Sequence, residues 1–463
     1  MKKILFLALV IALCFCLSPA IAQDDLPTVY TSGEYYYILL PDGTAEIAGY
    51  SGAEKELILP SSLDGYPVTS IGEYAFYACV SITSLSIPDS VTSIGYHAFY
   101  YCESLVSISI PDSIVSIGFG PFVQCTSLTS IQVSPDHPVL EVIDGVLFHK
   151  QKKELIYYPS AFSDTNYTIP QGTVIIGDFA FTDCKSLTSI SIPDSVISIG
   201  DGTFSSCERL ASITIPDSVT TIGIAAFTKC YSLVSVSIPE TITAIEDFTF
   251  RSCYSLTSVS IPNSITSIGN DAFSSCVSLT SISIPDGVIT IGNNAFFGCD
   301  ALASISLPHS VASIGSNAFF GCDALASIDI PSGVTYIGEK AFGSCISLTS
   351  VSIPNSITSI GEMVFAECDS LLFISIPDSV TSIGYAAFYS CDALASVSIP
   401  GSVTLIGDYA FSCCKSLSSA ALPASLASIG EEAFSQCASS LHFSVPHDSF
   451  ALNWCKENGF PFN

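Results

Sequence analysis

A 23-residue period runs through most of this 463-residue chain and limits what it can fold into. Cysteine marks the period most clearly: one series of three begins at Cys79, and after a gap of 59 residues a second series runs from Cys184 to Cys437. Each of these 15 cysteines has phenylalanine three residues before it and isoleucine eight before it. Glycine follows that isoleucine in 14 of the 15 repeats, and Glu246 is the exception. Such a period predicts stacked units, because no single unit can bury its apolar side chains alone.

The repeating unit reads L-x-S-I-x-I-P-D-S-V-x-S-I-G-x-x-A-F-x-x-C-x-S. Its first six positions alternate apolar and hydroxyl residues and are rich in β-branched side chains, which predicts a strand. Proline then ends the strand, since it cannot donate a ladder hydrogen bond. We expect one continuous parallel sheet built from these stretches. The side chains expected to point inward in one repeat are Val91, Ile94, Phe99, Cys102, Leu105, Ile108 and Ile110.

The stretch I-P-x-S-V-x-x-I-G-x-x-A-F-x-x-C closely resembles the BspA-like leucine-rich repeats of bacterial surface proteins and some protist ones. Two features depart from the general leucine-rich pattern: Ser113 stands where asparagine is usual, and the apolar Ile114 comes one position early. The resemblance covers nearly the whole mature chain. It implies an α/β-type repeat solenoid, right-handed, with a concave parallel β-sheet, 23-residue repeats and mostly β and irregular structure.

The ends of the chain and its one interruption complete the expected organisation. We expect a cleaved signal peptide at 1–22, because two lysines precede an apolar run and Ala20-Ile21-Ala22 offers a cleavage site. Cys14 and Cys16 leave a lipid-modified N-terminus as an alternative. The remaining segments are an N-terminal cap with a hairpin turn at Asp42-Gly43 (23–60), leucine-rich repeats (61–131), a long irregular repeat unit with a β-hairpin (132–171), further repeats (172–440) and a C-terminal cap (441–463).

The C-terminal cap should contain a short amphipathic helix. Asp448 or Ser449 suits its N-cap, and Gly459 suits its end. Phe450 and Trp454 are expected to face the last repeat and cover the open end of its core.

The charge of the chain limits the kinds of partner that it can bind. The formal net charge is −29, and so acidic a surface repels nucleic acid and anionic lipid headgroups. No run in the mature chain is long and apolar enough to cross a bilayer, so no membrane insertion is expected. The acidity suits either basic partners or simply an exterior that keeps an exported protein dispersed.

The sequence contains no recognisable catalytic, cofactor or metal-binding motif. A recurrent aspartate after the proline is read as turn chemistry, since one column of carboxylates converges poorly on a metal ion. The register cysteines are expected to be unpaired, because stacked Cβ vectors run parallel rather than toward each other. Cys413 and Cys455 lie outside the register and are the better disulfide candidates.

The candidate binding surface is the outward side of the expected sheet, which serine covers in two columns. Representative positions are Ser258, Ser281 and Ser304, and the columns are broken by Asp329 and Phe373. A second candidate is the basic cluster on the hairpin of the long unit, made of Lys150, Lys152 and Lys153, which is either a solvated tip or a contact point for an acidic partner. The resemblance implies a secreted or surface-displayed, adhesin-like module that binds a protein or cell-surface ligand. The alternatives are a structural coat scaffold and a carbohydrate-binding hydroxyl array.

Overall fold

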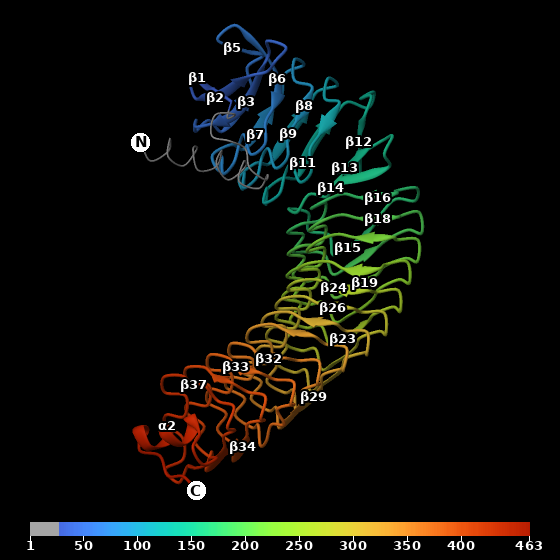
Figure 1. The fold of residues 1–463 in the computed structure, drawn as a ribbon. Coiled ribbons are helices and arrows are strands. Elements are labelled where there is room, and N and C mark those ends of the chain that lie inside the picture. Colours follow the sequence, from blue (N-terminus) through green and yellow to red (C-terminus); the bar gives the residue numbers. More distant parts are fainter. Residues whose placement is uncertain (1–26) are drawn as a thin grey trace. The chain divides into compact units, whose positions relative to one another are not determined.

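The computed structural model describes residues 27–463, so the expected signal peptide lies outside the described residues. These residues divide into two compact units, one ending at Arg209 and the other starting at Leu210. Within each unit successive turns of the chain lie side by side (Figure 1). In the described part of the chain no helix is long and apolar enough to cross a membrane.

Nearly every repeat contributes two short strands, on two sides of the coil. The first strand row comes from the L-x-S-I-x-I stretches. In the first unit it contains β4 (Glu56–Ile58), β7 (Ser84–Ser86), β9 (Ser107–Ile110), β11 (Ser130–Val133), β15 (Asn166–Thr168) and β17 (Ser189–Ser191). In the second unit it contains β19 (Ser212–Thr214), β21 (Ser235–Ser237), β23 (Ser258–Ser260), β25 (Ser281–Ser283), β27 (Ser304–Ser306), β29 (Ser327–Asp329), β31 (Ser350–Ser352), β34 (Ser396–Ser398), β36 (Ser419–Ala421) and β38 (His442–Ser444).

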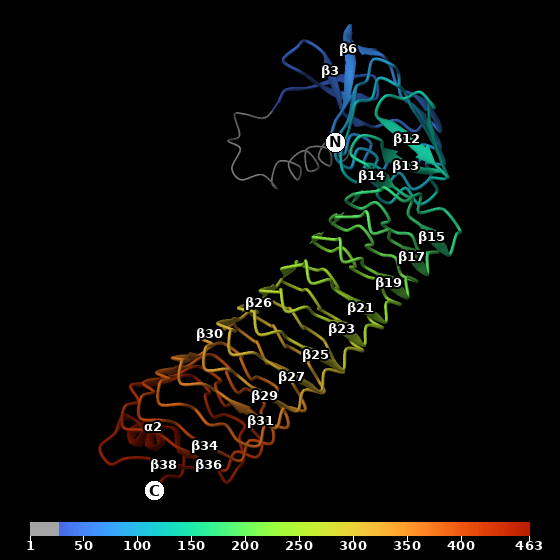
Figure 2. The ribbon, with the colours of Figure 1, turned by 90° about the vertical axis from the view of Figure 1, so that its right-hand side faces the viewer.

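The second strand row comes from the two residues before the glycine of each repeat, and the sequence reasoning missed it. In the first unit it contains β6 (Tyr66–Ile71), β8 (Ser93–Ile94), β10 (Ser116–Ile117), β16 (Ile175–Ile176) and β18 (Ser198–Ile199). In the second unit it contains β20 (Thr221–Ile222), β22 (Ala244–Ile245), β24 (Ser267–Ile268), β26 (Thr290–Ile291), β28 (Ser313–Ile314), β30 (Tyr336–Ile337), β32 (Ser359–Ile360), β33 (Ser382–Ile383), β35 (Leu405–Ile406) and β37 (Ser428–Ile429). The two rows are labelled on opposite sides of the coil in Figure 2.

Paired strands within each row run parallel, which confirms the predicted direction, and apart from β4 with β7 their partners are 23 residues apart. Ser107 of β9 pairs with Ser130 of β11, for example, and Ser281 of β25 with Ser304 of β27. The prediction of one continuous sheet is wrong, because the first row is divided into several sheets in each unit. One interruption coincides with a departure from the repeat: Leu372 and Phe373 occupy the start of an expected strand, and their repeat keeps only one bridge, at Ser375.

Two segments depart from the repeat in the first unit. At its N-terminal end β1 (Val29–Ser32), β2 (Tyr35–Leu39) and β3 (Ala45–Tyr50) form an antiparallel meander that joins the second row through β6, with β5 (Ser62–Leu63) alongside. The hairpin turn at Asp42-Gly43 joins β2 to β3, as the sequence indicates. In the long unit β12 (Leu140–Ile143), β13 (Val146–His149) and β14 (Glu154–Tyr157) are antiparallel, so this segment has three strands where the sequence indicates two.

Stacked side chains form the core of each unit. Phenylalanine rings of successive repeats are parallel, as at Phe296 and Phe319, whose centroids are 5.3 Å apart with 6° between the planes. Most register cysteines place their thiol against the carbonyl oxygen of the phenylalanine of the preceding repeat; the Cys322 Sγ to Phe296 O distance is 3.3 Å. At Cys79 and Cys184 the carbonyl belongs to Tyr50 and Tyr158 instead. The cysteine is therefore an apolar filler that also satisfies a buried carbonyl.

The described cysteines carry free thiols, in agreement with the expectation for the register positions. Burial raises the pKa of several of these thiols, to about 12 at Cys253 and Cys345, so they stay protonated and unreactive. Cys413 and Cys455 are also free, which corrects the suggestion that they are disulfide candidates.

Ser113 has a structural role in the position where asparagine is usual. Its hydroxyl donates to the carbonyl oxygen of Val91, one repeat earlier, over 2.6 Å. The equivalent Ser310 donates to Val288 O at 2.6 Å in the second unit. This serine column therefore joins neighbouring turns where the backbone forms no ladder.

The C-terminal helix α2 (Phe450–Asn458) follows Ser449, whose side chain accepts a hydrogen bond from Leu452 N, and it ends at Gly459. Trp454 contacts Phe434 of the last repeat and Phe443 of β38, with ring centroids 5.9 and 5.8 Å apart, as expected. Phe450 is 40% exposed and does not cover the core, because Ala451 and Cys455 occupy the buried side of the helix.

Candidate binding surfaces

The exposed side of the first strand row in the second unit is the surface that the sequence analysis singled out, and we call it the first-row face. Ser258, Ser281 and Ser304 are exposed on it, while the residue that follows each of them is buried. This alternation explains the serine columns: the strand turns every second side chain toward solvent. Asp329 is exposed on the same face at the end of β29.

Phe373 is the large apolar residue that interrupts the first-row face. Its side chain is 59% exposed, and the neighbouring Leu372 is 55% exposed. This degree of exposure leaves most of the Phe373 ring in solvent rather than folded over a neighbouring strand. The two side chains form an apolar patch among hydroxyls, at the point where the strand row is interrupted.

The three lysines of the long unit lie together in the turn between β13 and β14, but two of them make contacts within the protein. Lys150 Nζ donates to the carbonyl oxygen of His137 at 2.7 Å. Lys152 Nζ lies 3.7 Å from Glu154 Oε2. Lys153 is exposed and has a positive φ of 53°, so it forms the corner of the turn. The cluster thus has a structural role in holding the hairpin.

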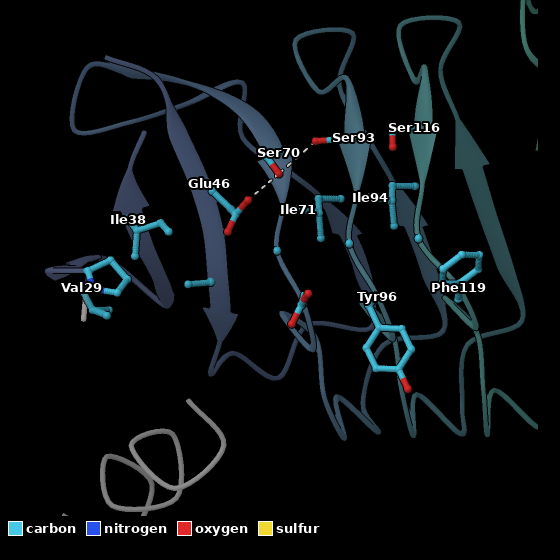
Figure 3. A pocket seen from close by; sticks show the side chains of 16 residues that line it. Val29, Ile38, Glu46, Ser70, Ile71, Ser93, Ile94, Tyr96, Ser116 and Phe119 are labelled. Atoms are coloured by element: carbon cyan, nitrogen blue, oxygen red, sulfur yellow. Dashed lines mark hydrogen bonds between the residues drawn. The ribbon is translucent and has the colours of Figure 1, made fainter. Parts of the chain in front are cut away.

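A groove of about 620 Å³ lies over the second strand row of the first unit, and sequence reasoning missed it. Figure 3 shows Val29 and Ile38 of the N-terminal meander at one end, and Tyr96 and Phe119 at the other. Glu46 of β3 lies between them. We call this site the meander groove.

The floor of the meander groove is a hydrogen-bonded row of side chains with a fixed direction. Ser93 Oγ donates to Ser70 Oγ at 3.0 Å, and Ser70 Oγ donates to Glu46 Oε2 at 2.7 Å (Figure 3). The serines thus direct their protons toward Glu46, which leaves an oxygen of Ser93 as an acceptor. The repeat glycines that line the groove, such as Gly72, leave space in it because they have no side chain. A Cβ at Gly72 would lie 2.8 Å from Glu46 Oε1.

His137, one of the scattered histidines, is a structural residue of the first unit. It is 1% exposed. Its Nδ1 accepts hydrogen bonds from Val139 N (3.1 Å) and Leu140 N (3.0 Å), and its Nε2 lies 3.1 Å from Pro111 O. This arrangement requires the neutral ring with the proton on Nε2. Burial is the main cause that lowers its pKa; the nearby Lys150 lowers it further, while the Pro111 carbonyl and Asp112 oppose the shift.

We expect the stability of the first unit to fall as pH decreases below about 6.5, the ordinary histidine pKa. Below this pH the imidazole of His137 is protonated in the unfolded chain but stays neutral in the folded protein, so protonation favours the unfolded state. His137→Gln should lower the unfolding free energy by about 2 kcal/mol at pH 7, since buried backbone groups lose partners. The substitution should also make the unfolding free energy, measured by urea titration, depend less on pH between pH 7 and 5. His442→Gln, at an exposed histidine, is the control; equal slopes for the two variants would contradict the assignment.

No catalytic constellation or metal centre emerges from these surfaces. Within residues 27–463 no group of three or more histidine, cysteine, aspartate or glutamate side chains is placed to hold a metal ion. What the geometry offers is exposed hydroxyl columns, an apolar patch and an acidic groove, all suited to binding.

Comparison with known proteins agrees with this geometry. The family model described as "BspA type Leucine rich repeat region (6 copies)" matches residues 55–167, 159–280, 266–395 and 363–453. The chain is therefore a leucine-rich-repeat protein. Within that class it belongs to the BspA-type family, as the sequence predicted. A comparison with curated proteins gives no match.

Several solved structures are similar to this chain. A leucine-rich cell surface protein from Faecalibacterium prausnitzii is 30% identical, with 88% of this chain and 95% of that chain covered and a TM-score of 0.40. A leucine-rich repeat protein from Bacteroides ovatus is 28% identical over 94% and 99% of the two chains, with a TM-score of 0.48. One from Eubacterium ventriosum is 26% identical over 64% and 95%, with a TM-score of 0.49. The family suggests a protein-binding or surface role, and its fold is generally non-enzymatic.

Proposed function

We propose that this chain is an exported binding protein, secreted or displayed at a cell surface, whose first-row face contacts a protein or cell-surface ligand in an adhesin-like manner. The proposal includes cleavage of residues 1–22 as a signal peptide and the division into caps, repeats and long unit given by the sequence. It takes the protein to be non-catalytic and without a cofactor.

The observation that carries the proposal is the exposed pair Leu372 and Phe373. Serine is the usual residue at the Phe373 position, and the repeat that carries the two apolar side chains keeps only one bridge in the first row. Exposed in this way, the two side chains reduce solubility without adding to the core. A surface coat without a ligand has no use for such a patch, and a carbohydrate array built on hydroxyls is interrupted by it. The exposed serines around the patch suit broad contact along the rows.

Phe373→Ser restores the repeat consensus and should leave the melting curve unchanged. Binding to a partner isolated by pull-down should weaken by about 1–2 kcal/mol, a typical loss on truncating a contact residue of moderate importance. Titration of the purified partner by calorimetry measures this difference.

Ile289→Thr is the matched control, because Ile289 is 51% exposed but lies outside the first-row face. It should bind as the unmodified protein does. Unchanged affinity of Phe373→Ser would rule out the patch, and failure to isolate any partner from host or neighbouring-cell extracts would favour the coat scaffold.

A further inference from the structure

Part of the lining of the meander groove comes from the column of residues that follows the repeat glycine, and the members of this column differ from repeat to repeat. In several repeats outside the groove this position supplies a side-chain oxygen that accepts the backbone N–H of the same position one repeat later, whereas other repeats have Ile224 or Tyr385 there. Asp247 Oδ1 accepts from Asn270 N at 2.6 Å, and Asn293 Oδ1 accepts from Ser316 N at 2.8 Å. In the first unit Asp178 Oδ1 accepts from Asp201 N at 2.8 Å.

In the groove the same column reads Glu73, Tyr96 and Phe119. A phenylalanine ring accepts no conventional hydrogen bond, so Phe119 cannot provide the link that aspartate or asparagine provides elsewhere. Its ring is also 55% exposed. Phe119 therefore leaves an exposed aromatic ring at the groove without contributing the hydrogen bond that aspartate or asparagine makes in other repeats.

The charge of the groove points to the chemistry of its ligand. Its lining contains two carboxyl groups, Glu46 and Glu73, and no lysine, arginine or histidine among the described residues that form it. The hydroxyl row ends on Glu46 and offers acceptor oxygens rather than free donors. Aromatic faces beside carboxylates attract cations, because the ring quadrupole and the negative charge act in the same direction. The net charge of −29 favours approach of a basic partner.

The extent of the groove indicates a chain rather than a small amine. From Glu46 to Ser116 it crosses four neighbouring strands, β3, β6, β8 and β10. At roughly 4.8 Å between strands this is a path of about 14 Å, the length of about four residues in an extended peptide. Val29 and Ile38 at one end supply apolar contact for the body of such a segment.

We propose that the meander groove binds a short, basic, extended peptide segment of a partner protein, with lysine or arginine side chains directed to Glu46, Glu73 and the rings of Tyr96 and Phe119. The site lies over the second strand row of the first unit, so it is independent of the first-row face and of the partner proposed for it.

The test uses the full chain and two capped tetrapeptides, acetyl-Leu-Lys-Leu-Lys-amide and the same peptide with both lysines acetylated, which removes their charge. Calorimetric titration at about 50 mM salt, where surface charges are little screened, should detect only the unmodified peptide. Glu46→Gln keeps an acceptor for Ser70 but removes the charge, and it should weaken binding about tenfold, as loss of a charged hydrogen bond does. Phe119→Asn, which introduces a residue native to this column, should weaken binding about fivefold.

Glu362→Gln is the control, because Glu362 occupies the same column in the second unit and its loss changes the net charge equally. It should leave binding unchanged. Thermal unfolding of each variant separates lost binding from lost structure, and Phe119→Asn remains informative if Glu46→Gln does not fold. The proposal is overturned if neither peptide binds, if both bind equally, or if all three variants bind alike. Charge-independent binding of a neutral oligosaccharide such as cellotetraose that displaces the peptide would also overturn it.

Discussion

Phe319→Ala should destabilise the second unit by about 3–5 kcal/mol, the range for truncating a fully buried phenylalanine. The side chain is 0% exposed and lies between Phe296 and Phe342, with ring centroids 5.3 and 5.4 Å away. Alanine would leave a cavity bounded by two rings that the neighbouring turns hold in place. The loss should be near the upper end of the range, because two stacked aromatic contacts disappear together.

Urea unfolding followed by circular dichroism measures the change. Phe297→Ala makes the same substitution one repeat earlier, at a ring that is 37% exposed and stacks on Phe320 at 5.5 Å. It should cost about 1 kcal/mol. Similar losses for the two variants would show that the phenylalanine column is not the core of the stack.

The core of the stack could be predicted from the sequence because every repeat has the same apolar residues at the same positions. Fifteen cysteines in one register predict a buried column, and the reduced, buried state of residues such as Cys322 follows from parallel Cβ vectors. Their bond to a carbonyl one repeat away was not predictable, since it depends on the exact rise between turns. Two-residue strands such as Ser93–Ile94 were missed because so short a segment has no periodicity to detect.

The candidate sites could be predicted only in part, because they depend on residues that depart from the repeat or lie outside it. Phe373 was identified because it departs from a serine column, and its exposure agrees with that reasoning. The meander groove was missed because it needs Glu46 of a non-repeating segment to meet Ser70, and no local pattern predicts that contact. The aromatic pair Tyr96 and Phe119 was the available signal, visible once the column after glycine is read by itself.

Two identical-looking Ile-Gly pairs in the second unit should respond oppositely to alanine. A Cβ on Gly338 would lie 2.3 Å from Ser316 N and 2.6 Å from Gly315 C, which are backbone atoms of the preceding turn. A Cβ on Gly361 would meet nothing closer than Val364 Cγ2 at 3.5 Å. Neither glycine has a positive φ, so backbone strain does not distinguish them.

The difference arises because the second strand row ends between β30 and β32, which leaves room over Gly361. Glu246, the one side chain in this column, likewise lies beside a small cavity of about 10 Å³ lined by Ile245 and Phe250. A side chain is thus accommodated only where neighbouring turns leave space.

Gly338→Ala should therefore lower the unfolding free energy by about 2–3 kcal/mol, since the added methyl group can fit only if two turns separate. Gly361→Ala should be neutral or raise it by about 0.4–1 kcal/mol, because alanine restricts the unfolded chain more than glycine does. The urea concentrations at the unfolding midpoints of the two variants, compared with that of the unmodified protein, test this difference. Equal destabilisation would mean that the two pairs have the same spacing and that the strand row is continuous there. If instead Gly338→Ala destabilises the protein and Gly361→Ala does not, the second strand row is interrupted at a point where the sequence pattern of the repeat is unchanged.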